Sequence, residues 1–81
     1  MRKSRVEQFY KNANGRYESR AYDYTIELSA GMSVEFSNEH HCNEIGRVEY
    51  DHQIQDYYIR RSGGEQWPIV DGIVLRVIYN D

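Results

Sequence analysis

Apolar and polar side chains alternate with period two over residues 22–36, and this pattern restricts the fold of the chain more than any other feature. One face of an extended strand would carry Tyr22, Tyr24, Ile26 and Leu28, and a second strand would continue with Met32, Val34 and Phe36. Such alternation is typical of strands that are buried on one face. Ser29-Ala30-Gly31 lies between the two segments, and its glycine suits the positive φ of a three-residue loop. The sequence therefore predicts a β-hairpin over residues 22–36.

Four further strands are expected, over residues 47–52, 53–61, 67–70 and 73–79, with turns at Ser62-Gly63-Gly64 and Asp71-Gly72. Pro68 cannot donate a backbone hydrogen bond, which places its strand at an edge of the sheet. The strand over residues 73–79 is apolar at nearly every position, as central strands covered on both faces are. Its second face therefore needs a cover.

The N-terminal segment is expected to provide this cover. Ser4 and Glu7 have the spacing of a capping box, which favours a short helix over residues 5–13. A hairpin across residues 12–15 is the alternative, because the side chains from Val6 to Tyr10 also alternate. The helix is the preferred interpretation.

The expected fold is mostly β, in the α+β class. It is one small domain over residues 1–81, with a twisted antiparallel sheet of five or six strands in meander order and one short N-terminal helix packed on a face. Residues 1–4 would form a flexible basic arm. The expected core contains seven apolar side chains: Tyr24, Ile26, Val34, Phe36, Val48, Leu75 and Val77.

The cellular compartment is predicted from what the sequence contains. Cys42 is the only cysteine, so no intrachain disulfide is expected, and an unpaired thiol is typical of a reducing compartment. No apolar run is long enough to span a bilayer. The basic N-terminus is not followed by an apolar stretch, as a secretory signal would be. A cytoplasmic protein without membrane contact is therefore expected.

Charge is distributed unevenly along the chain, behind a net charge of −3. Residues 1–20 carry six basic side chains against two acidic ones, residues 21–56 carry eight carboxylates against Arg47 alone, and residues 57–81 are balanced. Such asymmetry bears on partners and association rates more than on the fold. It indicates a protein that meets its partner through acidic side chains.

The predicted binding residues lie in this acidic segment and in the tyrosine pair that follows it. On the expected sheet, the polar face would carry Asp23, Glu27, Glu35, Glu49 and Asp51, with Tyr57 and Tyr58 as interface aromatics. Carboxylates at alternate positions of a strand lie about 6.6 Å apart, which is comparable to the spacing of phosphates along a nucleic acid. Such an array fits the basic groove of a larger, nucleic-acid-binding protein. The alternative is a solvated face that is acidic for solubility.

These features predict a small binding protein without enzymatic activity that acts as an antagonist of a larger protein. The analogy, in size and charge alone, is with phage and mobile-element inhibitors of host defence, of the anti-CRISPR or anti-restriction kind. Direct contact with nucleic acid is not expected, because the acidic segment would repel phosphates. A homodimer, or a structural subunit that assembles with copies of itself, is a further alternative.

One loop contains the side-chain types that bind zinc. Residues 39–44 read Glu-His-His-Cys-Asn-Glu, and His52 follows later in the chain. The spacing is poor for a structural zinc site, so neither metal nor cofactor is expected. The alternative function is a small metal- or thiol-dependent enzyme centred on this loop and His52. Its metal ligands would be His40, Cys42 and His52, or Cys42 would be a nucleophile with His40 or His41 as its base.

Overall fold

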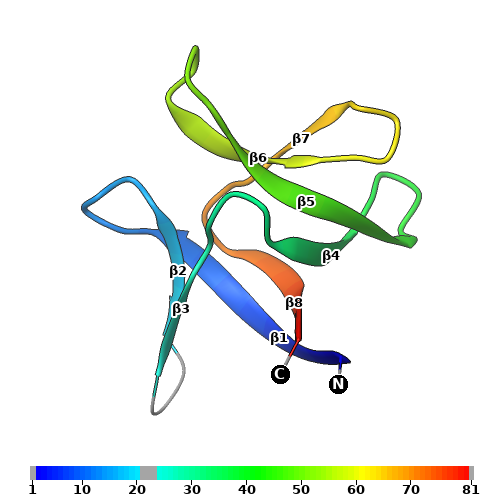
Figure 1. Ribbon diagram of the computed structural model, residues 1–81, viewed down its shortest axis with the longest axis horizontal. Helices are drawn as coiled ribbons and strands as arrows, with labels where there is room; N and C mark the ends of the chain where they lie inside the picture. The colour runs from blue at the N-terminus through cyan, green and yellow to red at the C-terminus, as the bar shows by residue number, and fades with distance from the viewer. Residues whose placement is uncertain (1, 21–23, 81) are drawn as a thin grey trace.

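The computed structural model describes residues 2–20 and 24–80, and within them the chain forms eight β-strands and no helix. The strands are β1 (Arg2–Lys11), β2 (Tyr17–Arg20), β3 (Thr25–Glu27), β4 (Ser33–Ser37), β5 (Asn43–Asp51), β6 (Asp56–Arg60), β7 (Gln66–Pro68) and β8 (Ile73–Asn80). They form one antiparallel sheet in the order β3-β2-β1-β8-β4-β5-β6-β7 (Figure 1). Two meanders, β1–β3 and β4–β7, are thus joined by β8, which lies between β1 and β4. The fold is all-β, and the predicted α+β class with five or six strands is wrong.

The predicted N-terminal helix is replaced by strand β1, which pairs with β8 from Arg2 to Phe9. The two residues of the apparent capping box have other partners. The Ser4 hydroxyl accepts a hydrogen bond from the Arg76 guanidinium at 3.1 Å, and the Glu7 carboxylate accepts one from the Tyr24 hydroxyl at 3.1 Å. The basic residues expected in a flexible arm, Arg2 and Lys3, belong to the same strand.

The alternative for this segment, a hairpin across residues 12–15, is confirmed. Asn12 donates its backbone N–H to the carbonyl of Arg16 at 2.7 Å, and its side-chain oxygen accepts from the backbone N–H groups of Asn14 and Arg16. Gly15 has a φ of 80°, which a residue with a side chain rarely adopts. The turn therefore connects β1 to β2, a strand that was not predicted.

The predicted hairpin over residues 22–36 is wrong, because β3 pairs with β2 whereas β4 pairs with β5 and β8. The chain changes neighbours between Leu28 and Met32. The N–H of Leu28 donates to the carbonyl of Tyr17 at 2.9 Å, and the N–H of Gly31 donates to the carbonyl of Val48 at 2.7 Å. Gly31 has the predicted positive φ, 97°, but it serves a corner between strands that are not paired.

The C-terminal part agrees better with the sequence. Strand β7 contains Pro68 and forms one edge of the sheet, as predicted, and β8 is central. Gly72 has a φ of 88° and Ile73 donates its N–H to the carbonyl of Val70, so the predicted turn is present. This turn connects β7 to β8 without pairing them. No segment of the described chain covers the second face of β8, where Val74 is 55% exposed.

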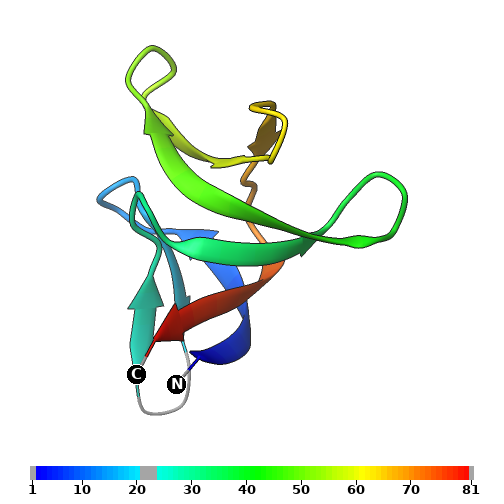
Figure 2. The ribbon, with the colours of Figure 1, turned by 45° about the vertical axis from the view of Figure 1, so that its right-hand side comes forward.

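The core lies on the concave side of the sheet, which bends strongly between its two meanders (Figure 2). Ten apolar side chains are buried there: Phe9, Tyr17, Leu28, Val34, Phe36, Val48, Ile59, Ile69, Leu75 and Val77. Five of the seven predicted core residues are among them, whereas Tyr24 and Ile26 are half-buried. The hydroxyl of Tyr17 donates to the carbonyl of Ile69 at 2.9 Å, so β2 is tied to the segment that follows β7.

Candidate binding surface on the outer face of the sheet

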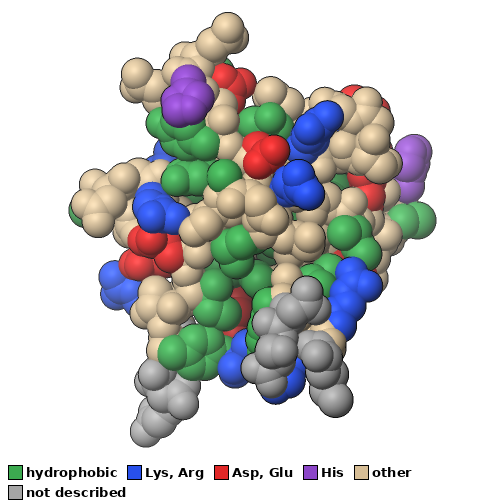
Figure 3. Space-filling model, in the orientation of Figure 1, with side chains coloured by type: hydrophobic (Ala, Val, Ile, Leu, Met, Phe, Trp, Pro, Cys, Tyr) green, Lys and Arg blue, Asp and Glu red, His purple; other side chains and the backbone are tan. Residues whose placement is uncertain are grey.

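The carboxylates of the acidic segment are largely paired with cations from the rest of the chain. Glu27 lies 3.0 Å from Arg16, Glu35 lies 3.4 Å from Arg76, and Asp56 lies 3.1 Å from Lys11. The basic N-terminal segment and the C-terminal strand are folded beside the acidic segment, so opposite charges meet. On the face shown in Figure 3, acidic and basic side chains are accordingly mixed, and no continuous acidic area is visible.

The predicted acidic binding residues do not gather in one place. Asp23 lies outside the described residues. Glu27 on β3 and Glu35 on β4 belong to strands that β2, β1 and β8 separate in the sheet. Glu49 and Asp51 share the outward face of β5, where the backbone N–H of Gln53 holds the pKa of the Asp51 carboxyl below its usual value.

The two predicted interface tyrosines point to opposite faces of β6. Tyr58 lies directly across from Glu49 on β5, and both side chains are half-buried. Tyr57 pairs with Tyr50 on the other face, with ring centroids 4.9 Å apart in an edge arrangement. The structure therefore brings Tyr58 together with Glu49, but not with Glu27 or Glu35.

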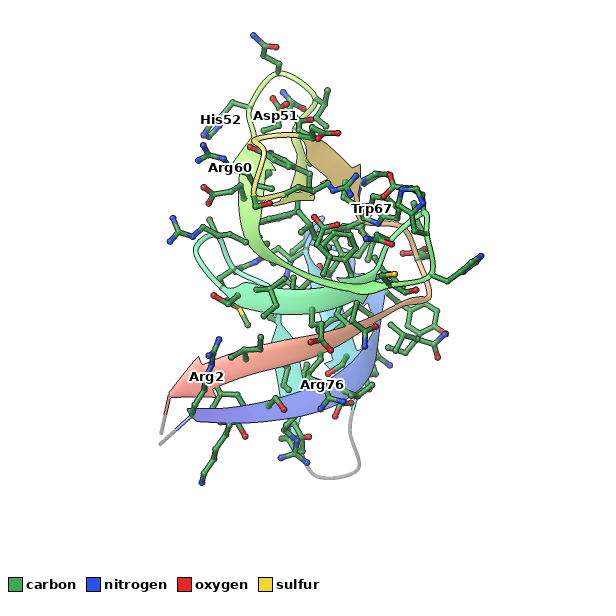
Figure 4. All side chains as sticks on the ribbon, turned by 90° about the vertical axis from the view of Figure 1, so that its right-hand side faces the viewer. Arg2, Asp51, His52, Arg60, Trp67 and Arg76 are labelled. Atoms are coloured by element: carbon green, nitrogen blue, oxygen red, sulfur yellow. The ribbon has the colours of Figure 1, made fainter. Side chains whose placement is uncertain are left out.

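The side chains with metal-ligand chemistry are dispersed. His40 and Cys42 precede the first residue of β5, whereas His52 follows its last residue, and the strand is nine residues long. A strand of that length spans about 30 Å. Figure 3 shows histidine side chains at two well-separated places, and in Figure 4 His52 lies beside Asp51 at the top of the view. Within residues 2–20 and 24–80, no three His, Cys, Asp or Glu side chains are placed to hold a metal ion.

Two side chains hold the loop before β5 in place, one by accepting hydrogen bonds and the other by donating them. The side-chain oxygen of Asn38 accepts from the backbone N–H groups of His40 and Cys42, at 2.9 and 3.1 Å. The Arg61 guanidinium donates to the carboxylates of Glu39 and Glu44 at distances of 2.8–3.0 Å.

This arginine also connects the loop to the core. Its guanidinium lies 5.4 Å from the ring centroid of Trp67, and that ring packs against Phe36. Hydrogen bonds from Arg61 hold the pKa of both Glu39 and Glu44 below their usual values. The acidic residues of the loop thus have a structural partner.

The outer face is the surface opposite the core on β1, β8, β4, β5 and β6. Residues paired directly across antiparallel strands point to the same side, so their register defines rows on this face. One row passes through Val6, Arg76, Glu35 and Ile45. The next row passes through Ser4, Ile78, Ser33, Arg47 and Arg60. These two rows carry three arginines and one glutamate, so this part of the face is more basic than acidic, contrary to the charge of the segment that supplies β4 and β5.

Two shallow hollows meet at Ile45 on the outer face. One has a volume of about 300 Å³ and is lined by Ser33, Ile45, Gly46, Arg47, Arg60, Arg61 and Ser62. The other has a volume of about 320 Å³ and is lined by Arg2, Lys3, Ser4, Glu35, Ile45, Arg76 and Ile78. Arg2 and Arg60 lie on the same side of the ribbon in Figure 4. Each hollow therefore has three basic side chains in its lining.

Several of these cations are not neutralised by the fold. Among the described residues, no carboxylate lies within 4.0 Å of Arg2, Arg47 or Arg60. Arg47 and Arg60 are also direct cross-strand neighbours. Sequence reasoning missed this surface because it added up charges by segment. The available signal was the hairpin of residues 47–61, whose register around its turn places the two arginines opposite each other.

Comparisons of the chain with protein-family models, with curated proteins and with solved structures found no match. The function is therefore argued from the surface itself.

Proposed function

We propose that this chain is a binding protein that acts as an antagonist of a larger protein by docking its outer face on that partner. The observation that carries this proposal is the position of Ile45, which is 50% exposed at the point where the two basic hollows meet. Surfaces of this composition, with an apolar centre and arginines around it, are typical of protein interfaces.

The uncovered second face of β8 supports the proposal. A strand that is apolar on both faces is usually covered on both. Here the inner face, with Leu75 and Val77, is buried in the core, whereas Val74 and its neighbour Val6 on β1 are 55% and 52% exposed. A partner that covers this face would remove apolar surface from water, which favours association.

The proposal retains a larger protein as the partner but moves the contact away from the acidic residues. Glu27 and Glu35 already have arginine partners, so docking them into a basic groove would require an exchange of ion pairs. Such an exchange gains little free energy. Nucleic-acid mimicry is therefore supported less well than docking through the outer face.

An enzymatic role has less support from the geometry. The Cys42 thiol lies 3.6 Å from the carbonyl oxygen of His40, which cannot activate it as a base. Its loop is exposed, and its acidic residues are engaged with Arg61. These contacts favour binding over catalysis as the role of the chain.

The experiment compares two exposed isoleucines. Ile45→Ser changes the centre of the outer face, whereas Ile54→Ser changes the tip of the β5–β6 hairpin, where Ile54 is 61% exposed. Each tagged variant is used to capture proteins from a lysate of the source cells, and the captured protein is then purified for affinity measurements. We expect Ile45→Ser to weaken the interaction at least tenfold and Ile54→Ser to leave it unchanged. Equal affinities for both variants would contradict the proposal.

A further inference from the structure

Arg47 and Arg60 form a cross-strand pair of like charges, and neither has an ion-pair partner among the described residues. Like charges directly opposite each other on neighbouring strands repel. The next outward residue of β5, Glu49, lies opposite Tyr58 and forms no ion pair within 4.0 Å among the described residues. Two arginines directly opposite each other, both lining the same hollow, bring several N–H donors to one part of the face. Such a pair suits a carboxylate or a phosphate, which accepts hydrogen bonds from both.

The second hollow repeats this chemistry on the other side of Ile45. Arg2 has no carboxylate within 4.0 Å among the described residues, and Arg76 shares the hollow with its partner Glu35. The Arg76 side chain is still 45% exposed, so it has donors available for a further acceptor. The outer face thus offers two places for an anion, with an aliphatic side chain between them.

The centre of the surface distinguishes between two classes of anionic partner. Single-stranded nucleic acids bind where aromatic rings stack on their bases. The residues between the hollows are aliphatic: Ile45, and Ile78 beside it, provide no flat ring. The net charge of −3 also disfavours a long polyanion, whose attraction depends on many cations. A protein segment that alternates carboxylates with an apolar side chain fits both the charge and the shape.

We infer that the outer face recognises an acidic segment of its partner protein. The segment places carboxylates in the two hollows and an apolar side chain on Ile45. This inference rests on the proposed function, and it adds the chemistry of the partner. It reverses the charge expected from the sequence, since the partner is acidic and the binding face is basic.

The probe is a synthetic peptide with glutamates on either side of a central leucine, titrated into isotope-labelled protein and followed by NMR. A lysine peptide of the same design and a single-stranded oligothymidine are titrated in parallel. The informative variant is Arg47→Glu with Arg60→Glu, which keeps a like-charge pair on the two strands and changes only its sign. Arg20→Glu on β2 is the matched control, because its side chain is 85% exposed and lies away from both hollows.

The glutamate peptide is expected to shift the resonances of Ile45, Arg47 and Arg60. Hydrogen bonds to charged groups are stronger than those between neutral groups, so the double variant should bind this peptide at least about tenfold more weakly. The same variant should gain affinity for the lysine peptide, and Arg20→Glu should behave as the parent does. If the double variant does not fold, Arg60→Gln is used, and a severalfold loss is expected.

The inference is contradicted by any of three results. The first is that the double variant binds the glutamate peptide as tightly as the parent does. The second is that the glutamate peptide shifts resonances of residues outside the outer face. The third is that oligothymidine binds at the same residues more tightly than the glutamate peptide does. The proposed function fails separately. If Ile45→Ser loses the captured partner while the charge reversal does not, the proposal that the partner docks on this face is kept. The inference that the partner presents an acidic segment is then wrong.

Discussion

Arg47 and Arg60 lie directly opposite each other on β5 and β6. We expect Arg60→Glu to raise the free energy of unfolding by roughly 0.2–1 kcal/mol, because a repulsive cross-strand pair becomes an attractive one. Chemical denaturation measures the change, with Arg20→Glu as a control for the altered net charge. An unchanged or lower stability would show that the two guanidinium groups do not repel, and would remove one reason for assigning them to a ligand.

Tyr17 makes one of the contacts between the first meander and the segment that follows the second. Its hydroxyl donates to the carbonyl of Ile69, and both residues are 4% exposed. Tyr17→Phe leaves that carbonyl without its donor, which costs roughly 1–3 kcal/mol for a buried acceptor. Burial also raises the pKa of the Tyr17 hydroxyl, so it remains a donor at neutral pH. Denaturant unfolding should show the loss for Tyr17→Phe and no loss for Tyr10→Phe, since Tyr10 is exposed.

At the scale of elements, the loop before β5 is held to the β6–β7 turn by Arg61. The pKa of Glu39 and of Glu44 is lowered in the folded state by hydrogen bonds from this guanidinium. A carboxyl whose pKa is depressed on folding contributes stability above its unfolded value, and this contribution is lost as the pH falls through the folded pKa. The Arg61 interaction should therefore stabilise the protein at neutral pH. This stabilisation should decrease as the pH falls below 4.5, the ordinary pKa of a glutamate carboxyl.

The contribution of Arg61 to stability is measured by thermal unfolding of the parent and of Arg61→Gln at several pH values. The difference in melting temperature should be largest near pH 7 and should narrow as the pH is lowered below 4.5. A constant difference across that range would mean that Arg61 acts through its contact with Trp67 alone.

The elements also show which parts of the fold the sequence can predict. Alternation correctly predicts which side chains of β4 and β5 face the core, the two core residues expected in β8 are buried, and Pro68 correctly predicts an edge strand. Alternation does not identify the neighbouring strand, so the hairpin over residues 22–36 was wrong although the glycine in its loop has the predicted φ.

The N-terminal error has a similar cause. Ser4 and Glu7 match a helix start in sequence, but their side chains bond to Arg76 and Tyr24, which are distant along the chain. The candidate binding surface was missed for a related reason. Its rows combine residues from β1, β8, β4, β5 and β6, and that order is set by long-range pairing.

At the scale of the whole molecule, β8 joins the two meanders, and Leu75 lies at 0% exposure within it. We expect Leu75→Ala to lower the free energy of unfolding by roughly 2–5 kcal/mol, because a buried leucine leaves a cavity when it is truncated. Small domains have little stability in reserve, so much of the population should unfold. Val74→Ala on the exposed face of the same strand is the control, and its effect should be small. A cooperative, equally stable Leu75→Ala variant would show that β8 does not hold the meanders together.

The strand order also determines where the charges of the chain lie on the folded molecule. A basic N-terminal segment, an acidic middle and a neutral C-terminal part are interleaved by the strand order, so Glu27, Glu35 and Asp56 pair with cations of the chain and the arginines of β5 and β6 remain on the outer face. The fold thereby gives a net-acidic chain an outer face with two rows that are basic and partly apolar.

The most direct test of that surface is photo-crosslinking in the source cells. A photoreactive amino acid replaces Ile45 in one variant and Ile54 in another, since both side chains are exposed and only the first lies on the outer face. Irradiation should join the position-45 variant to one larger protein, and the position-54 variant should give no such product. Equal products from both positions, none from position 45, or a product with twice the mass of the chain would contradict docking of the outer face on a larger protein.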